Sequence, residues 1–164
     1  VPSITAPMGI YSERVSKFSD VKEGDSVTLP NDPANLARAL QLLAQQGLIT
    51  LKDGIDPLRV GTRDVVKNPR KLHFVPVEAA QLPRTVGDAT LAIVPGNYAT
   101  AAGLDFTHAL TLETPPVAYQ QVVAVRHVDE SSPWAQDLKK AFRSEAFRQA
   151  LDRYFPDYVR PEGL

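Results

Sequence analysis

Residues 25–40 read D-S-V-T-L-P-N-D-P-A-N-L-A-R-A-L, and this stretch joins a strand to a helix. Apolar and polar residues alternate over positions 25–29, which is typical of a short strand. Asp32 can accept hydrogen bonds from first-turn amides and Pro33 has the φ angle of a first helical position, so a helix should begin here. Leucines then recur at helical spacing, which predicts one apolar helix face.

The same alternation of strand and helix continues along the chain. We expect further strands at residues 48–51, 72–77, 91–94 and 120–125, and further helices at residues 62–66, 79–86, 97–102, from 132 and from 144. The run at 91–94 is continuously apolar, which is typical of a buried parallel strand. Strands that alternate with helices predict an α/β layer fold with a largely parallel sheet.

Composition excludes several classes of protein. The chain has 164 residues, of which 43% are hydrophobic and 23% charged, as in ordinary globular domains. Its formal charge is -1, so no net field attracts nucleic acid. Cysteine is absent, which removes disulfides and thiolate nucleophiles. No apolar run approaches the length of a membrane span.

Catalytic and metal motifs are also missing. The three histidines, His73, His108 and His127, have no short metal-ligand spacing. The serines lack a Gly-x-Ser-x-Gly elbow, and no phosphate loop is present. The sequence therefore predicts neither an enzyme nor a metal or cofactor site.

Two segments carry candidate binding residues, because ligands of open α/β sheets sit at the carboxyl ends of strands. The first segment contains Asn31, Asn35 and Arg38 around a helix start. Amides at a helix N-terminus favour a carboxylate or phosphate, and a guanidinium can bind two oxygens at once. The second segment is a turn with Asn97 and Tyr98, which could orient an amino or carboxyl group.

Each candidate also has a purely structural interpretation. Asparagines at a helix start or in a turn, such as Asn31, Asn35 and Asn97, often cap or shape the backbone. Arg38 could lie on a solvated helix face, and Tyr98 could be a packing residue. The residues alone leave both interpretations open.

Several segments together resemble one known family, the methionine-binding lipoproteins of the MetQ/NlpA type. The matching segments, in the family's order and spacing, are P-M-G-I-Y-S at residues 7–12, residues 30–40, G-L-I-T-L-K-D-G at 47–54, D-V-V-K-N-P-R-K-L at 64–72, Q-L-P-R at 81–84, and G-N-Y-A at 96–99 with A-G-L at 102–104. The resemblance covers nearly the whole chain.

This resemblance implies a periplasmic-binding-protein fold of type II, in which two α/β lobes close on an amino acid. Residues 15–116 would form one complete lobe, and residues 1–14 and 117–164 the crossovers and part of an incomplete second lobe. The protein would bind methionine or a related amino acid and deliver it to a membrane ABC permease and its ATPase. It would be periplasmic or on the cell surface, lipid-anchored through an N-terminal segment absent from this chain.

The resemblance also implies roles for individual residues. Arg38 would hold the ligand carboxylate, Asn35 would lie beside it, and Asn97 and Tyr98 would lie on the facing turn. One departure concerns Pro95, because the family commonly has a ligand-important asparagine there. Proline offers no side-chain hydrogen bond and no backbone donor.

A second departure is that family members usually continue for a substantial stretch before the P-M-G segment. We therefore expect weak or absent binding by this chain, and apolar helix faces that are exposed or covered by a homodimer or domain exchange. An alternative is the effector-binding domain of a regulatory protein, because that class uses the same two-lobed fold.

Overall fold

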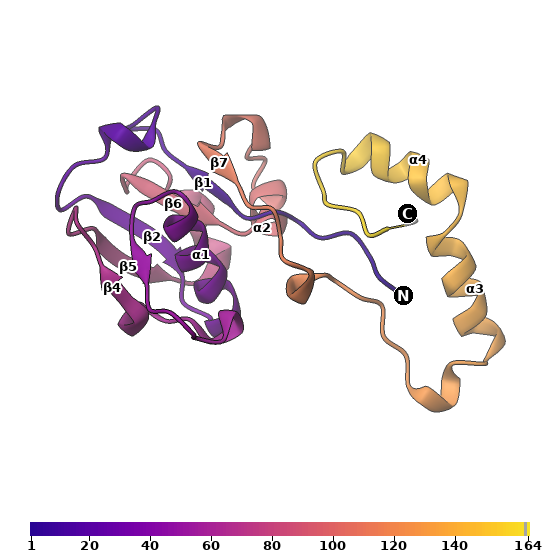
Figure 1. Cartoon of the computed structure of the whole chain (residues 1–164). Coiled ribbons are helices and arrows are strands. Elements are labelled where there is room, and N and C mark those ends of the chain that lie inside the picture. The colour runs from indigo at the N-terminus through magenta and orange to yellow at the C-terminus, as the bar shows by residue number, and fades with distance from the viewer. Residues whose placement is uncertain (163) are drawn as a thin grey trace. The chain divides into compact units, whose positions relative to one another are not determined.

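The computed structural model describes residues 1–162 and 164 and divides the chain into two compact units (Figure 1). The sheet unit is Met8–Glu113, and the terminal unit combines Val1–Pro7 with Thr114–Leu164. The sheet unit thus begins earlier than the lobe boundary expected at residue 15, because the first strand belongs to its sheet.

A five-stranded sheet forms the centre of the sheet unit. Its order is β5 (His73–Val77), β2 (Ser26–Pro30), β6 (Leu91–Val94), β1 (Gly9–Tyr11) and β7 (Thr111–Leu112). Strand β2 lies between β5 and β6 and runs parallel to both, whereas β1 runs antiparallel to β6 and β7. The sheet is therefore mixed. The largely parallel arrangement that the sequence predicts is found only among β5, β2 and β6.

Helix α1 (Pro33–Gln45) covers one face of this sheet and begins as the sequence predicts. The Asp32 carboxylate accepts a hydrogen bond from the Asn35 amide, and Pro33 occupies the first turn. The helix is followed by Gly47, whose φ of +71° is favourable only for residues without a Cβ. Its buried side chains join strand residues in one core, which includes Leu40, Leu43, Ile10, Val27, Leu29 and Ile93.

The opposite face of the sheet carries a second apolar cluster. Side chains alternate along a strand, so Ala92 and Val94 point away from the face that Leu91 and Ile93 occupy. Ala92 and Val94 pack with Leu82 and with Ala99 of α2 (Gly96–Ala101). The sheet is thus packed on both faces, and both helices follow its parallel strands.

Short elements complete the two units. A second sheet pairs β3 (Thr50–Leu51) with β4 (Val65–Lys67) in antiparallel orientation. The 3-10 segments are Phe18–Asp20, Pro57–Arg59, Thr62–Asp64, Ala79–Thr85, Phe106–His108, Val117–Tyr119 and His127–Asp129. The helix predicted at 62–66 is wrong, because residues 62–64 form only a 3-10 turn and Val65 and Val66 belong to β4. Pro83 lies inside the segment expected as a weak helix, where it removes a backbone donor.

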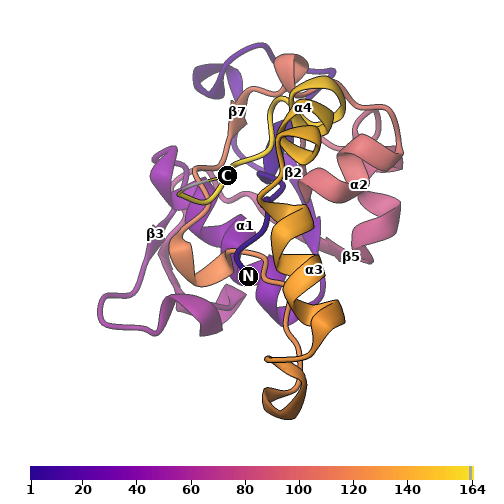
Figure 2. The same cartoon turned by 90° about the vertical axis from the view of Figure 1, so that its right-hand side faces the viewer.

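The terminal unit consists of extended segments and two helices, α3 (Pro133–Phe142) and α4 (Glu145–Tyr154), which follow one another along the chain (Figure 2). Ser132 and Ser144 cap them through their side chains, at the positions from which the sequence predicts helices. The strand expected at 120–125 is wrong. The structure describes only a single bridge there, between Val122 and Pro2, and a strand persists only where a continuous partner pairs with it.

The terminal unit buries few apolar side chains. Among its described residues, Ala135 and Leu151 are buried hydrophobics, whereas Trp134, Tyr154 and Val122 are 53%, 62% and 63% exposed. Trp134 of α3 and Tyr154 of α4 are thus exposed within the single chain, and their coverage by a homodimer or domain exchange stays a prediction. Among the described residues, no helix is both long and apolar enough to cross a membrane.

Candidate ligand-binding site

The two predicted binding segments lie at one edge of the sheet. Strands β2 and β6 are parallel neighbours, with Val27 opposite Leu91, so their carboxyl ends reach the same edge. Asn31 follows β2 directly, and Asn97 lies in the first turn of α2 after β6. This edge collects the amino ends of both helices, where an open α/β sheet binds ligands.

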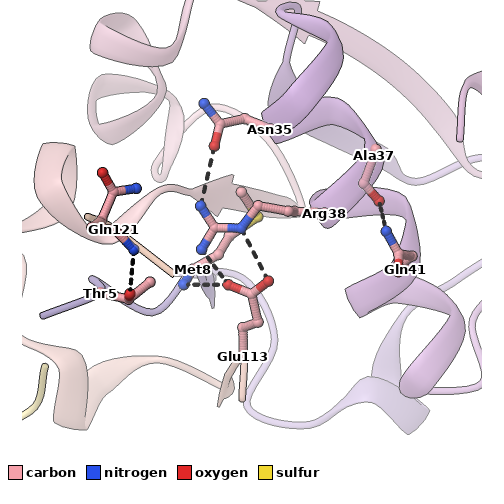
Figure 3. Close-up of polar contacts among 8 residues, drawn as sticks. All are labelled: Thr5, Met8, Asn35, Ala37, Arg38, Gln41, Glu113 and Gln121. Atoms are coloured by element: carbon pink, nitrogen blue, oxygen red, sulfur yellow. Dashed lines mark hydrogen bonds and ion pairs between the residues drawn. The ribbon is translucent and has the colours of Figure 1, made fainter. Parts of the chain in front are cut away.

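Arg38 is buried in the first half of α1, with 8% of its surface exposed. Its guanidinium forms a two-point ion pair with Glu113: Nε donates to Oε1 at 3.1 Å and Nη2 donates to Oε2 at 2.5 Å. Figure 3 shows Arg38 between Glu113 and Asn35, whose Oδ1 accepts from Nη1 at 3.3 Å. The interpretation of Arg38 as a solvated residue is therefore wrong.

Asn35 links the start of the helix to Arg38. Its amide nitrogen Nδ2 donates to Asp32 Oδ2 at 3.1 Å, while its Oδ1 accepts from Arg38. Asp32 in turn accepts the backbone N–H of Asn35 at 3.0 Å. The side chain of Asn35 thus orients the guanidinium, and its own orientation is fixed by the residue that caps the helix.

Glu113 directly follows β7, which is an edge strand of the five-stranded sheet. Its Oε2 also accepts the backbone N–H of Met8 at 3.1 Å, and its own N–H donates to Met8 O at 2.7 Å. Its side chain is 5% exposed. A buried carboxylate is tolerated when it is paired and fully hydrogen-bonded, and Glu113 meets both conditions.

The remaining predicted residues have more open surroundings. Asn31 and Asn97 are exposed, and the Asn31 backbone N–H donates to Val77 O at 3.0 Å. Tyr98 is half-buried against the second apolar cluster, which agrees with a packing role. Pro95 is buried at the start of α2 and gives that helix no side-chain cap. Ligand contact by Asn31, Asn97 and Tyr98 stays a prediction.

Sequence reasoning missed Glu113, although it contacts the most informative candidate. It lies 75 positions from Arg38, in a short segment without a recognisable motif. One signal could have pointed to it. An arginine on the apolar face of a core helix needs a counter-charge, and the end of a neighbouring strand is a natural place to seek one.

A second buried polar group lies on β1 in the same unit. The Tyr11 hydroxyl is a buried group for which the described residues supply no hydrogen-bond partner. Burial, with a smaller contribution from the charge of Asp105, raises the pKa of Tyr11 from 10.0 to about 12. Hydrogen bonds from the hydroxyl and the backbone of Thr107 lower the pKa of Asp105. The described residues contain no cluster of three or more side chains suited to a metal ion.

The chain matches the protein-family model described as NlpA lipoprotein over residues 1–162. The chain belongs to the NlpA lipoprotein family. The resemblance found in the sequence motifs is therefore confirmed.

Relatives within the NlpA family support the same assignment. The chain is 32% identical over 150 residues to a protein of Vibrio cholerae named probable D-methionine-binding lipoprotein MetQ, covering 91% of this chain and 55% of that protein. It is 33% identical to the D-methionine-binding lipoprotein MetQ of Salmonella typhi, covering 91% of this chain and 56% of that protein. The chain thus spans about half the length of these curated relatives.

Solved structures agree on the fold. A periplasmic substrate-binding protein of an ABC transporter from Coxiella burnetii matches with a TM-score of 0.89 and 37% identity, covering 98% of this chain and 68% of that chain. A nutrient-binding protein from Burkholderia cenocepacia, described as bound to methionine, matches with a TM-score of 0.89 and 36% identity over 97% of this chain and 68% of that chain. This NlpA-family chain therefore has the expected periplasmic-binding-protein fold.

Proposed function

We propose that this chain is part of the substrate-binding component of an ABC importer for methionine or a related amino acid. The observation that carries the proposal is the buried Arg38, held by two side chains at the sheet edge where α/β proteins bind ligands. A fixed guanidinium suits a carboxylate, which every amino acid possesses. The names of the relatives supply methionine as the first ligand to test.

The binding roles extend to the other candidates at this edge. Arg38 binds the ligand carboxylate, Asn35 holds the guanidinium, and Asn31, Asn97 and Tyr98 contribute from the two helix starts. The activity is binding and delivery, without a catalytic step. The remaining partners are a membrane permease and its ATPase, and the protein acts outside the cytoplasm, attached through a lipid anchor.

The two-lobed organisation of the importer component is a further part of the proposal. The sheet unit Met8–Glu113, close to the expected residues 15–116, corresponds to one complete lobe, and the terminal unit belongs to a second lobe. The exposed apolar side chains of the terminal unit favour a homodimer or exchange of segments between copies. Light scattering gives the mass of the particle in solution, and a monomer at high concentration would contradict this association.

Isothermal titration with L-methionine, D-methionine and a panel of other amino acids tests the function. We expect weak saturable heat with methionine or a close analogue, because the chain spans only about half the length of its relatives. The variant Arg38→Ala should lose about 2–5 kcal/mol of binding free energy, because a buried charge partner of the carboxylate is removed. Arg59→Ala is the matched control, since Arg59 is exposed and pairs with Asp56 nearby.

Two outcomes would contradict the proposal. One is the absence of heat with every amino acid in the panel. The other is equal affinity of Arg38→Ala and the unchanged chain, which would remove Arg38 from the site.

A further inference from the structure

Glu113 connects the candidate ligand residue Arg38 to both ends of the sheet unit. The chain enters this unit at Met8 and leaves it after Glu113. The carboxylate of Glu113 accepts from the Met8 backbone N–H and from two nitrogens of Arg38. One buried side chain therefore fixes the guanidinium relative to the two segments where the polypeptide crosses into the unit.

The geometry of the ion pair fixes the plane of the guanidinium. The Glu113 carboxylate accepts hydrogen bonds from Nε and Nη2 of Arg38, and Asn35 Oδ1 accepts one from Nη1. Each of the three guanidinium nitrogens therefore has a partner. An arginine side chain has many rotamers, and ordering them costs free energy when a ligand binds. With the orientation fixed in advance, the ligand carboxylate meets a guanidinium that needs little further ordering.

The charge of the pair has a second consequence. Arg38 and Glu113 together are neutral, and their side chains are 9% and 5% exposed. A zwitterionic amino acid adds no net charge to this poorly hydrated region. A simple carboxylate anion would add a negative charge close to the Glu113 carboxylate, and like charges in a region of low dielectric repel strongly.

We propose that Glu113 is a positioning residue for Arg38 and that, by balancing its charge, Glu113 makes the site select zwitterionic amino acids over simple carboxylate anions. This inference rests on the proposed function. It names the class of ligand that the site accepts and the residue that sets this preference.

The test compares two ligands that differ only in the ammonium group, L-methionine and its desamino analogue, the methylthio-butanoate anion. The whole chain is titrated with both ligands, alongside Glu113→Gln and the control Glu23→Gln. Glu23 forms an exposed pair with Lys71, so its charge change leaves the buried pair intact. The ratio of the two affinities is the readout, because a merely structural defect would weaken both ligands alike.

We expect the unchanged chain and Glu23→Gln to prefer methionine by about tenfold or more, the scale of one close charge interaction. Glu113→Gln should shift the ratio toward the anion by about tenfold, because the uncompensated guanidinium then favours a negative ligand. An unchanged ratio in folded Glu113→Gln would overturn the proposal.

Two further measurements keep the proposal testable. If Glu113→Gln does not fold, Glu113→Asp replaces it. Its shorter carboxylate should weaken both ligands and also speed the solvent exchange of the Arg38 Nε–H, which a structural defect elsewhere would leave unchanged, while the preference for methionine remains. Wild-type affinity in Glu113→Asp would count against positioning. If the unchanged chain binds neither ligand, the proposed function fails. The NMR resonance of the Arg38 Nε–H then tests the positioning role by itself. We expect this proton to exchange slowly with solvent in the unchanged chain and rapidly in Glu113→Gln. An unaltered exchange rate would refute the positioning role of Glu113.

Discussion

At the residue scale, Glu113 forms a buried ion pair with Arg38 inside the sheet unit. Replacing it with alanine leaves the Arg38 charge in a buried position without its carboxylate partner. We expect Glu113→Ala to lower the free energy of unfolding by about 3–5 kcal/mol, the usual cost of removing one member of a buried ion pair. Urea denaturation measures this change.

The matched control is Glu23→Ala, which breaks the exposed pair with Lys71. Exposed pairs contribute about 0–1 kcal/mol, so this variant should unfold close to the unchanged chain. Similar losses in the two variants would show that the buried pair contributes no more than a surface pair.

Tyr11 predicts a specific pH dependence. Its pKa is about 12 in the folded chain against 10.0 as the ordinary value, so the folded state retains a proton that the unfolded state releases between these pH values. The contribution of the protonated Tyr11 to the free energy of unfolding is fully present below pH 10 and is lost as the pH rises toward 12. The loss amounts to about 2–3 kcal/mol of unfolding free energy.

The variant Tyr11→Phe isolates this effect, because it differs from the unchanged chain only in the Tyr11 hydroxyl. We expect it to lack the Tyr11 part of the alkaline loss and to gain about 1 kcal/mol at neutral pH, since it removes a buried hydroxyl without a protein partner. Denaturation at pH 9 and pH 11.5 would contradict the expectation if both proteins lost equal stability.

At the residue scale, the sequence predicted the positions that local chemistry marks and missed those that only tertiary structure joins. Asp32 and Pro33 define a helix start through interactions within a few residues. Arg38 stood out because it follows that start on one helix face. Its partner Glu113 could not be found in this way, since only the pairing of β1 with β7 brings it close to α1.

At the element scale, Asp32 at the start of α1 both caps the helix and holds the side chain of Asn35, which contacts Arg38. Asp32→Ala removes the bonds that Asp32 accepts from the backbone and the side chain of Asn35. We expect a loss of about 1–2 kcal/mol in unfolding free energy, at the upper end for a helix cap. The measurement is thermal or urea unfolding.

Asp56→Ala provides the comparison for this cap. Asp56 also accepts a backbone amide bond, but it starts only the short 3-10 segment Pro57–Arg59, and its side chain is 53% exposed. Its loss should be clearly smaller than that of Asp32→Ala. If Asp56→Ala lost as much unfolding free energy as Asp32→Ala or more, the cap of α1 would stabilise the chain no more than the cap of a 3-10 turn.

Elements with strong local signals were predicted well, and elements that depend on partners were not. The strand expected at residues 120–125 has an apolar pattern, yet the structure describes only one bridge there. The antiparallel β1 and β7 also escaped prediction, because three or two residues hold too little periodicity to recognise a strand. In both cases the hydrogen-bonded pairing with other strands determines whether a strand forms, and a local sequence pattern does not contain that information.

At the scale of the whole molecule, the two units differ in how much apolar surface they bury. Helix α1 buries Leu40, Leu42 and Leu43 among its residues, whereas α3 and α4 each have one buried residue, Ala135 and Leu151. Local opening requires less free energy where fewer apolar contacts must break. Unequal stability along one chain follows from this difference.

Hydrogen exchange measured by mass spectrometry tests this inequality. We expect amides of α3 and α4 to exchange at least about 100-fold faster than those of α1, which corresponds to a difference of roughly 3 kcal/mol in opening free energy. Measurement at two protein concentrations provides the control. Protection of α3 and α4 that grows with concentration would mean that a second copy covers Trp134 and its exposed neighbours. Protection equal to that of α1 at both concentrations would contradict the expected difference, because few buried side chains would then suffice to hold these helices closed.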